Sequence, residues 1–174
     1  WEYKTSNWVW SSPAYDAESG LLVGGDLDGH VFALDAKTGG EVWAYDAKSP
    51  VVSTPTIVRP SDGEAIVYVT AGGDPNLFTL SLEKGTEVVP PASIRVDFET
   101  SFLWMKTGTD SRSVPLYGAV TVPDDSILIP VHAAQPDIRP LQSFSRDDLK
   151  LQWALDPTSY KQHSESASGS GGFF

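Results

Sequence analysis

LLVGGDLDGHVFALDAKTGGEVW, residues 21–43, alternates short apolar segments with turn-forming residues. The apolar segments at 21–23 and 31–34 have the length and composition of β-strands. Asp26-Leu27-Asp28-Gly29 stands between them, and its glycine supplies the positive φ that a tight hairpin needs. A second turn, Lys37-Thr38-Gly39-Gly40, follows. The stretch therefore predicts antiparallel strands joined by two tight hairpin turns.

The rest of the chain has the same character. Short apolar segments recur at 65–69, 77–80, 119–122 and 127–129, separated by proline- and glycine-rich stretches. No segment keeps a helical periodicity over ten or more residues. We therefore expect an all-β fold.

The chain repeats itself. Residues 31–43 align without gaps on 77–89. Ser11-Ser12-Pro13 matches Ser53-Thr54-Pro55, and Trp1-Glu2-Tyr3 matches Trp43-Ala44-Tyr45, each about 42 residues later. A repeat of this length with four short strands is typical of a β-propeller blade, in which a closing tryptophan can cover the seam to the next blade.

A third copy is weaker. Ser113-Val114-Pro115 takes the place of the Ser-x-Pro element, and 127–129 takes the place of the next strand. Leu141 to Trp153 again spans thirteen residues and ends in tryptophan. Its turn has no glycine, because Asp147-Asp148-Leu149 stands where residues 37–39 stood.

Residues 21–43 resemble the repeat of the PQQ-like (quinoprotein-type) β-propellers. That repeat reads roughly as an apolar strand, Gly-Ser-x-Asp-Gly, a strand Leu-Tyr-Ala-Leu-Asp-Ala-x-Thr-Gly and a closing tryptophan. The family includes quinoprotein alcohol and glucose dehydrogenases, outer-membrane assembly scaffolds and many exported or lumenal proteins. The resemblance therefore identifies the repeat but leaves the activity open.

The domain organisation follows from the repeat. We expect PQQ-like propeller blades over residues 1–156, with repeats at about 1–43, 44–89 and 110–156 and an insertion at about 90–110. Residues 157–174 form a Ser/Gly-rich C-terminal tail with the composition of a linker.

Three blades are too few for a ring, because propellers close with about 4–8 blades. We therefore expect a partial β-propeller of four-stranded antiparallel blades that this chain alone does not close. Other protein chains, or the missing blades of its own propeller, would cover the open faces. Residue 1 is Trp and no signal peptide is present, so the expectation is a processed product, a fragment or part of something longer.

Composition excludes several classes of function. The chain has 174 residues, 23 Asp and Glu against 12 Lys and Arg, and a formal net charge of -11. Such an acidic protein would be repelled by nucleic acid and by anionic membranes. No apolar stretch approaches the roughly 18 residues needed to span a bilayer. There is no Cys, which excludes disulfides, thiolate zinc sites and a Cys nucleophile.

No catalytic or metal-binding residue emerges from the motifs. Asp26-Leu27-Asp28-Gly29 resembles the start of a calcium loop, but position twelve is Lys37 where that loop needs Glu. The histidines, His30, His132 and His163, lack metal-ligand spacing. Neither Gly-x-Ser-x-Gly nor Gly-x-Gly-x-x-Gly occurs in a usable context.

The resemblance implies an enzyme alternative, a fragment of a PQQ-dependent dehydrogenase. Such an enzyme needs PQQ, Ca²⁺ held by oxygen ligands and an Asp base. No ligand set matches residue by residue, so we assign no catalytic position and expect PQQ and Ca²⁺ only under this alternative. The sequence favours a protein that is not an enzyme.

Partner-binding residues are expected in the two segments that break the repeat. The insertion carries Phe98, Phe102, Leu103 and Trp104, and the tail ends in Phe173 and Phe174. Large apolar anchors of this kind suit protein interfaces. The competing interpretation folds the insertion back on its own blade.

The preferred function is a non-enzymatic β-propeller scaffold that mediates protein–protein interaction as a subunit of a larger assembly. A further alternative is an exported carbohydrate- or ligand-binding propeller, in which Trp8, Trp10 and Trp104 offer stacking faces instead of packing between blades. The resemblance and the absence of Cys favour an exported, periplasmic or organelle-lumenal location.

Overall fold

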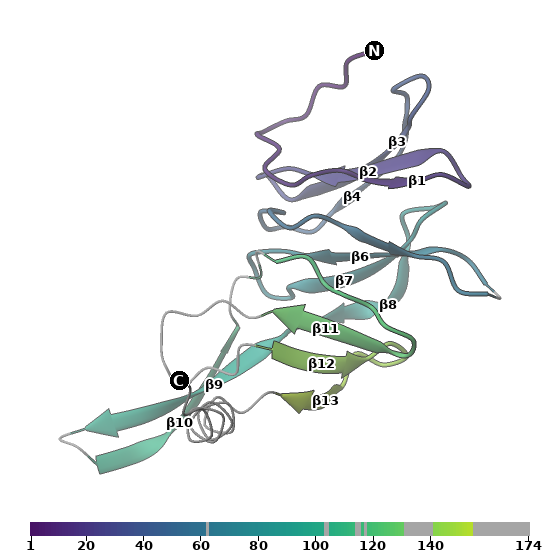
Figure 1. The fold of residues 1–174 in the computed structure, drawn as a ribbon. Helices are drawn as coiled ribbons and strands as arrows, with labels where there is room; N and C mark the ends of the chain where they lie inside the picture. The colour runs from purple at the N-terminus through teal and green to yellow at the C-terminus, as the bar shows by residue number, and fades with distance from the viewer. Residues whose placement is uncertain (62, 103–104, 114–115, 117, 131–140, 155–174) are drawn as a thin grey trace, which may run out of the picture.

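A computed structural model describes residues 1–61, 63–102, 105–113, 116, 118–130 and 141–154. For 96–102 and 105–113 it describes the backbone alone. The described part is all-β, and its antiparallel sheets follow one another in chain order (Figure 1).

The first sheet confirms both hairpins expected from residues 21–43. Its strands are β1 (Ala14–Asp16), β2 (Leu21–Gly25), β3 (His30–Asp35) and β4 (Glu41–Asp46), paired in that order. Gly29 ends the β2–β3 turn with a φ of 96°, and Gly39 lies in the β3–β4 turn with a φ of 73°. Both values lie in the left-handed region that glycine adopts at little cost.

The second sheet repeats the first. Its strands are β5 (Thr56–Val58), β6 (Ile66–Thr70), β7 (Leu77–Ser81) and β8 (Glu87–Ala92), again paired in chain order. The gapless alignment of 31–43 with 77–89 thus places β3 and β4 on β7 and β8. Gly85 takes the place of Gly39, with a φ of 68°.

The third sheet is smaller than the four strands expected for it. It contains β11 (Ser126–Pro130), β12 (Leu141–Ser145) and β13 (Leu151–Ala154). The place of a first strand is taken by a single bridge between Thr121 and Leu128. Pro123 follows shortly, and its missing N–H cannot extend this ladder.

The third sheet keeps the β3–β4 type of turn without its glycine. Leu149 has a φ of 55°, and its N–H donates to the Ser145 carbonyl at 3.1 Å. Gly39 and Gly85 donate to the carbonyls of Asp35 and Ser81 at 2.8 and 2.9 Å. A left-handed leucine is strained, and the burial of its side chain offsets that cost.

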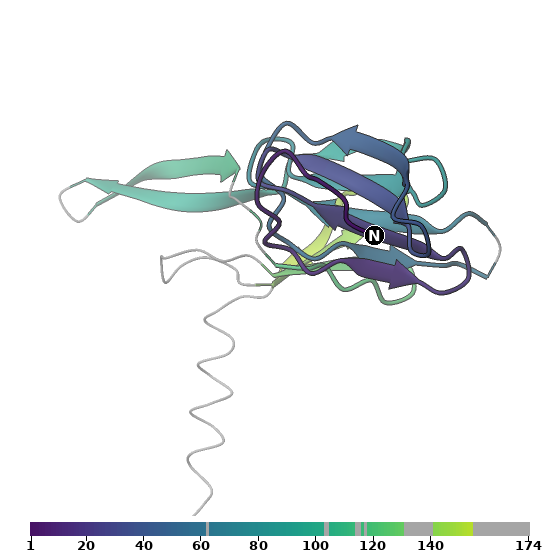
Figure 2. The same ribbon diagram turned by 90° about the horizontal axis from the view of Figure 1, so that it is seen from above.

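The insertion forms a hairpin of β9 (Arg95–Phe102) and β10 (Met105–Ser113), which among the described strands pair only with each other. Figures 1 and 2 show it extending away from the stacked sheets. The interpretation that folds the insertion back on its own blade is therefore wrong. Each strand pairs along one edge with the other strand, and its outer edge meets no strand of the described sheets.

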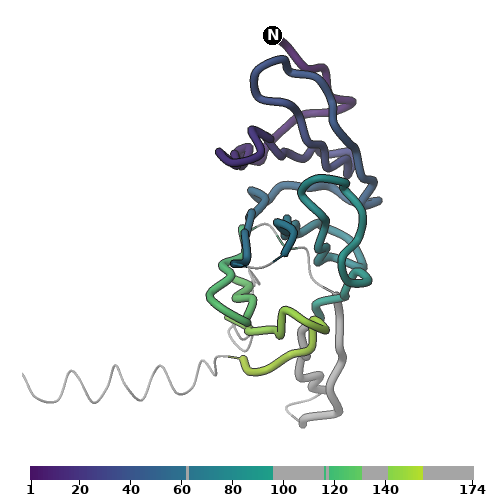
Figure 3. The backbone as a smooth tube through the Cα atoms, turned by 90° about the vertical axis from the view of Figure 1, so that its right-hand side faces the viewer, coloured from purple at the N-terminus to yellow at the C-terminus, as the bar shows by residue number. Residues whose placement is uncertain are grey.

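The core lies between the sheets. One buried cluster joins the first and second sheets and includes Val31, Val51 and Leu80. Another joins the second and third and includes Tyr68, Ile127 and Leu149. The described sheets form an open series that does not return on itself (Figure 3). The fold is thus an unclosed stack of propeller-type blades.

Leu149 gives the first prediction. Leu149→Ala should lower the free energy of unfolding by about 2–5 kcal/mol, because it removes a buried side chain and keeps a left-handed residue with a Cβ. Leu149→Gly should cost about 1 kcal/mol less than Leu149→Ala, because glycine adopts this φ freely. Urea unfolding of both variants measures the order. A Leu149→Ala variant at least as stable as Leu149→Gly would contradict the strained turn.

Candidate functional site: the blade seams and the projecting hairpin

The seam between the first and second sheets is built around Trp43. Its indole Nε1–H donates to the Leu82 carbonyl at 2.7 Å, and the side chain is only 8% exposed. The ring lies directly over Gly85, where an added Cβ would be 2.5 Å from a ring carbon. Only glycine leaves room for the indole there, and only glycine adopts the turn's φ without strain.

The same contact occurs 42 residues earlier in the chain, on the other side of the first sheet. Trp1 donates its Nε1–H to the Ala36 carbonyl at 3.0 Å. A Cβ added at Gly39 would lie 2.4 Å from the Trp1 ring. Because Trp1 corresponds to Trp43 at the end of a blade, residues 1–4 lie where the fourth strand of a preceding blade would lie.

A tyrosine reinforces each of these two seams. Tyr45 stacks edge-on against Phe78 with ring centroids 5.8 Å apart, and its hydroxyl donates to Glu87 at 2.6 Å. Burial, followed by the neighbouring Glu87 carboxylate, raises the pKa of Tyr45 above its ordinary range.

The first seam repeats this arrangement. The Tyr3 and Phe32 rings are 5.1 Å apart, and Tyr3 donates its hydroxyl to Glu41. Burial and Glu41 raise the pKa of Tyr3 to about 12. Both tyrosines therefore stay protonated and donate across their seam throughout the neutral range.

A backbone hydrogen bond also joins consecutive blades. The Val51 N–H donates to the Asp26 carbonyl at 3.0 Å, and the Val51 side chain is fully buried against Gly25. Leu116 is likewise buried, and its N–H donates to the Ala71 carbonyl at 3.3 Å. These bonds fix the start of the second and third blades on the residue that follows the second strand of the blade before.

Val9 takes the corresponding place in the first sheet, but no described residue covers it. Its neighbours Trp8 and Trp10 are 72% and 62% exposed. No described blade lies on that side of the first sheet, so whether these two tryptophans pack between blades stays a prediction. Trp104 lies outside the described residues.

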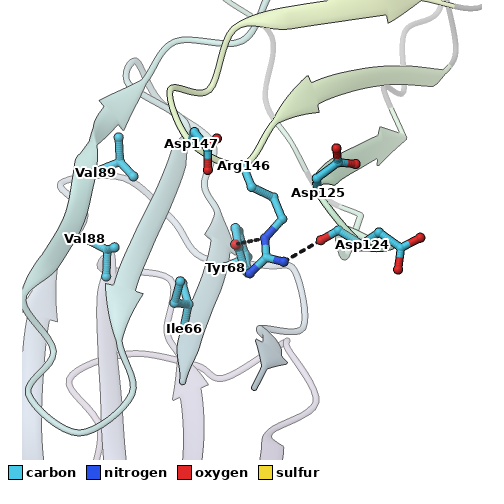
Figure 4. A pocket seen from close by; sticks show the side chains of 8 residues that line it. All are labelled: Ile66, Tyr68, Val88, Val89, Asp124, Asp125, Arg146 and Asp147. Carbon is cyan, nitrogen blue, oxygen red and sulfur yellow. Dashed lines mark hydrogen bonds between the residues drawn. The ribbon is translucent and has the colours of Figure 1, made fainter. Parts of the chain in front are cut away.

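The seam between the second and third sheets contains a pocket of about 480 Å³ (Figure 4). The Arg146 Nε–H donates to the buried Tyr68 hydroxyl at 3.1 Å, and its Nη1 donates to the Asp124 carbonyl. Ile66, Val88 and Val89 line the apolar side. Arg146 thus links the β12–β13 turn to β6. The described residues that line the pocket include no nucleophile paired with a base.

This seam uses different residues from the other two. Val89 stands where the alignment places Trp43, and Leu149 stands in the place of Gly85. Leu149 and Val89 belong to the same buried cluster. At this seam the bulky side chain is Leu149, in the turn of the following blade, while the preceding blade contributes only Val89. The seam is thus filled without an indole.

The Asp26 carboxylate stabilises its own hairpin. Its side chain is buried, and its Oδ1 accepts from the N–H groups of Asp28 and His30, each at 3.0 Å. Its Oδ2 accepts the Ser6 hydroxyl at 2.9 Å and lies 3.4 Å from the His30 Nδ1. Asp26-Leu27-Asp28-Gly29 is therefore the hairpin turn that the sequence indicated.

These contacts set the charge of Asp26. Burial alone would raise the pKa of its carboxyl, but hydrogen bonds from two backbone N–H groups and from the Ser6 hydroxyl outweigh burial and lower the pKa. The repeat does not predict this burial, because Ala71 takes the place of Asp26 in the second blade, where its N–H donates to the Asn76 carbonyl as that of Asp26 donates to the His30 carbonyl.

The structure places the predicted partner-binding residues only in part. Phe98 and Phe102 lie in β9, paired with Asp110 and Met105 of β10. Leu103, Trp104, Phe173 and Phe174 lie outside the described residues, as do His132 and His163.

Sequence reasoning missed the residue that fixes the base of the hairpin. Asn76 is fully buried in the second sheet, and its Nδ2 donates to the Ile94 carbonyl at 3.1 Å. Its Oδ1 accepts the Ile94 N–H at 2.7 Å. Asn76 aligns with His30 in the repeat, and the change from histidine to asparagine was the available signal.

The described residues lack two kinds of feature. They contain no group of three or more His, Cys, Asp or Glu side chains arranged to hold a metal ion. They also contain no helix with the length and apolarity needed to cross a membrane.

Comparison with known sequences identifies the repeat. The family model described as outer membrane protein assembly factor BamB matches residues 1–170. Quinoprotein alcohol dehydrogenase PedE of Pseudomonas putida and quinoprotein ethanol dehydrogenase of Pseudomonas aeruginosa are each 38% identical over 72 residues. That match covers 41% of this chain and 11% of each relative, so about a tenth of each relative's length is matched.

Solved structures agree on the fold. The quinohemoprotein alcohol dehydrogenase from Comamonas testosteroni superimposes with a TM-score of 0.57 at 20% identity, over 86% of this chain and 21% of that one. The computationally designed protein Ika4 gives a TM-score of 0.58 at 16% identity, over 88% of this chain and 75% of that one. At these identities the likeness shows the fold alone.

The Trp43 seam gives a stability prediction. Gly85→Ala should lower the free energy of unfolding by about 2–4 kcal/mol, because the added Cβ needs an unfavourable φ and meets a buried indole. Gly40→Ala is the matched control, since its Cβ would meet only the Thr38 Oγ1 at 3.3 Å. That variant should cost less than about 1 kcal/mol by urea unfolding. Equal losses of stability in the two variants would contradict the packing of Trp43 on Gly85.

Asp26 gives a pH prediction. Because its pKa is lower in the folded state, its stabilising contribution is present above the unfolded pKa of about 3.9 and is lost as pH falls through the folded pKa. Asp26→Ala should therefore cost about 2 kcal/mol at neutral pH, and the difference from the parent should shrink below about pH 4. Unfolding curves across this range measure it, with exposed Glu83→Ala as control. A difference that stays constant with pH would contradict the assignment.

Proposed function

We propose that this chain, which belongs to the PQQ-like repeat family described as outer membrane protein assembly factor BamB, is a non-enzymatic scaffold that mediates protein–protein interaction. It would act as a subunit of a larger assembly. The observation that carries this proposal is the projecting hairpin β9–β10, which belongs to no blade (Figures 1 and 2).

The hairpin is built as an arm on a fixed base. Asn76 clamps Ile94 at the foot of β9 through two hydrogen bonds. Asp74 adds an ion pair to Arg95 at 3.2 Å. Beyond this base, β9 and β10 pair over eight and nine residues with no third strand on either edge in the described chain. A paired ribbon with two open edges suits docking on another protein.

The register places two phenylalanines on one face of this arm, with Thr100 between them and with Asp110 opposite Phe98. Phe98 and Phe102 stand at alternate positions of one strand, and Phe102 is paired with Met105 across the ribbon. Because alternate positions of a strand share one face, these residues belong to the same face. Leu103 and Trp104 of the connecting turn, and Phe173 and Phe174 of the tail, are proposed as further anchors.

The enzyme alternative rests on the 38% identity to two quinoprotein dehydrogenases over 72 residues. The described residues do not fit the cofactors of such an enzyme. They offer no metal-binding group of acidic side chains, and the guanidinium in the seam pocket is engaged by Tyr68 and the Asp124 carbonyl. We therefore derive no step through PQQ or Ca²⁺ for this chain.

The ligand-binding alternative rests on the exposure of Trp8 and Trp10. Indole faces left open to solvent can stack on sugars. The repeat favours another use for them, because their counterparts Pro50 and Val52 flank Val51, which is buried against the preceding blade.

Site-specific photocrosslinking in the producing cell tests the scaffold. A benzoylphenylalanine at position 98 or 102 should give a discrete protein adduct, whereas one at the exposed Tyr15 of β1 should not. The purified protein should show no dye reduction that depends on added PQQ and Ca²⁺. Cofactor-dependent dye reduction, or adducts no different between the hairpin and position 15, would overturn the proposal.

A further inference from the structure

We propose that the seam pocket between the second and third sheets binds an α-amino acid with an apolar side chain, either free or as a short peptide. Arg146 would hold the carboxylate of this ligand, Asp147 its ammonium group, and the valines of β8 its side chain. The inference goes beyond the proposed scaffold, because it concerns a small ligand and does not involve the arm β9–β10.

The seam pocket has the size and the two-sided lining that such a ligand needs. Its volume of about 480 Å³ lies within the roughly 300–1,000 Å³ of pockets that bind small molecules. Ile66 of β6 and Val88 and Val89 of β8 form an apolar side, and the third blade contributes the charged residues (Figure 4). A ligand that suits both sides therefore carries an apolar group beside its charges.

Arg146 stands where the other two blades have an apolar residue. It takes the place of Ala36 and Leu82, because the backbone N–H of each donates to the residue just before the second strand of its blade, at 3.1, 3.0 and 2.8 Å. The same turn therefore forms without an arginine in the other blades. Because the turn needs no charge at this position, the Arg146 side chain is available for a role outside the turn.

Two hydrogen bonds orient the Arg146 guanidinium without neutralising its charge. Its Nε–H donates to the buried Tyr68 hydroxyl at 3.1 Å, and its Nη1 donates to the Asp124 carbonyl. No carboxylate of the described chain forms an ion pair with it, and its Nη2 has no acceptor among the described residues. Figure 4 shows the guanidinium facing Ile66. A fixed guanidinium with unused N–H groups is suited to bind a carboxylate.

The aspartates of the seam pocket require a positive charge on the same ligand. Asp124, Asp125 and Asp147 line the pocket, and none of them forms an ion pair within the described chain. A ligand that carries only carboxylates would be repelled by them. Figure 4 shows Asp147 on the side of Arg146 that faces Val89, and the other two aspartates on the opposite side. An ammonium group next to a carboxylate, as in an α-amino acid, matches the Arg146 and Asp147 side chains.

Calorimetric titration of the intact chain with L-leucine tests the inference. We expect saturable binding with a dissociation constant below about 1 mM. N-acetyl-L-leucine lacks the ammonium group, L-leucinamide lacks the carboxylate, and L-serine lacks the apolar side chain. Each should bind at least about tenfold more weakly than leucine, because each leaves one part of the pocket without its partner. Leucine that does not bind, or analogues that bind as tightly as leucine, would overturn the inference.

L-leucyl-L-leucine distinguishes the two sources of this chemistry. It has the same terminal charges as leucine, but one peptide unit separates them. Binding at least about tenfold tighter than that of leucine would identify a short peptide as the ligand, and weaker binding would identify the free amino acid. Either result supports the site, whereas a chain that binds neither compound would contradict it.

Two neighbouring aspartates give a matched pair of variants. Asp147→Asn should weaken leucine binding at least about tenfold, because it removes the charge that faces the ammonium group and keeps the size of the side chain. Asp148→Asn is the control, since it changes the net charge equally but alters a carboxylate that pairs with Lys150 and does not line the pocket. That variant should bind leucine within about twofold of the parent. Equal effects of the two substitutions would overturn the assignment of Asp147.

Methyl NMR of the unmodified chain locates the ligand without any substitution. Val88 and Val42 occupy the same position of two blades and are 48% and 49% exposed, but only Val88 lines the pocket. We expect the Val88 methyl signals to shift with the dissociation constant measured for leucine, and the Val42 signals to stay in place. Shifts of both valines, or of neither, would overturn the inference.

Discussion

The structure depends on an indole lying over a glycine. Trp43 can cover Gly85 only because that residue has no Cβ, and its N–H can reach the Leu82 carbonyl only because the turn holds a left-handed φ. The same glycine therefore shapes the turn and receives the neighbouring blade. Trp1 and Gly39 repeat this contact. The spacing between blades is therefore set by a local contact between neighbouring blades and not by the size of the whole ring.

The third seam shows how this device can be replaced. Leu149 keeps the left-handed turn that glycine makes in the other two blades. Val89 is smaller than the tryptophan at the same position of the first blade, and it packs in the same apolar cluster as Leu149. Arg146 adds a hydrogen bond to Tyr68 that neither of the other seams has. The seam is thus closed by a different set of side chains, and the arm β9–β10 leaves the stack between the second and third blades.

Sequence reasoning predicted the features that recur. The spacing of Trp1 and Trp43, and the turns at Gly29 and Gly39, indicated blades and hairpins that the structure confirms. It missed the features that occur once. A left-handed Leu149, the clamp of Asn76 on Ile94 and the burial of Asp26 depend on tertiary contacts of single copies, and no periodicity reports them. The path of the insertion also could not be predicted, because it depends on the pairing of β9 with β10.

Hydrogen exchange of the six tryptophan indole N–H groups, followed by NMR, tests the central claim most directly. The account predicts that in the isolated chain the Trp43 indole exchanges slowly, while the indoles of Trp8, Trp10 and Trp153 exchange rapidly. A Trp43 indole that exchanges as fast as that of Trp8 would contradict the seam on which the stack is built.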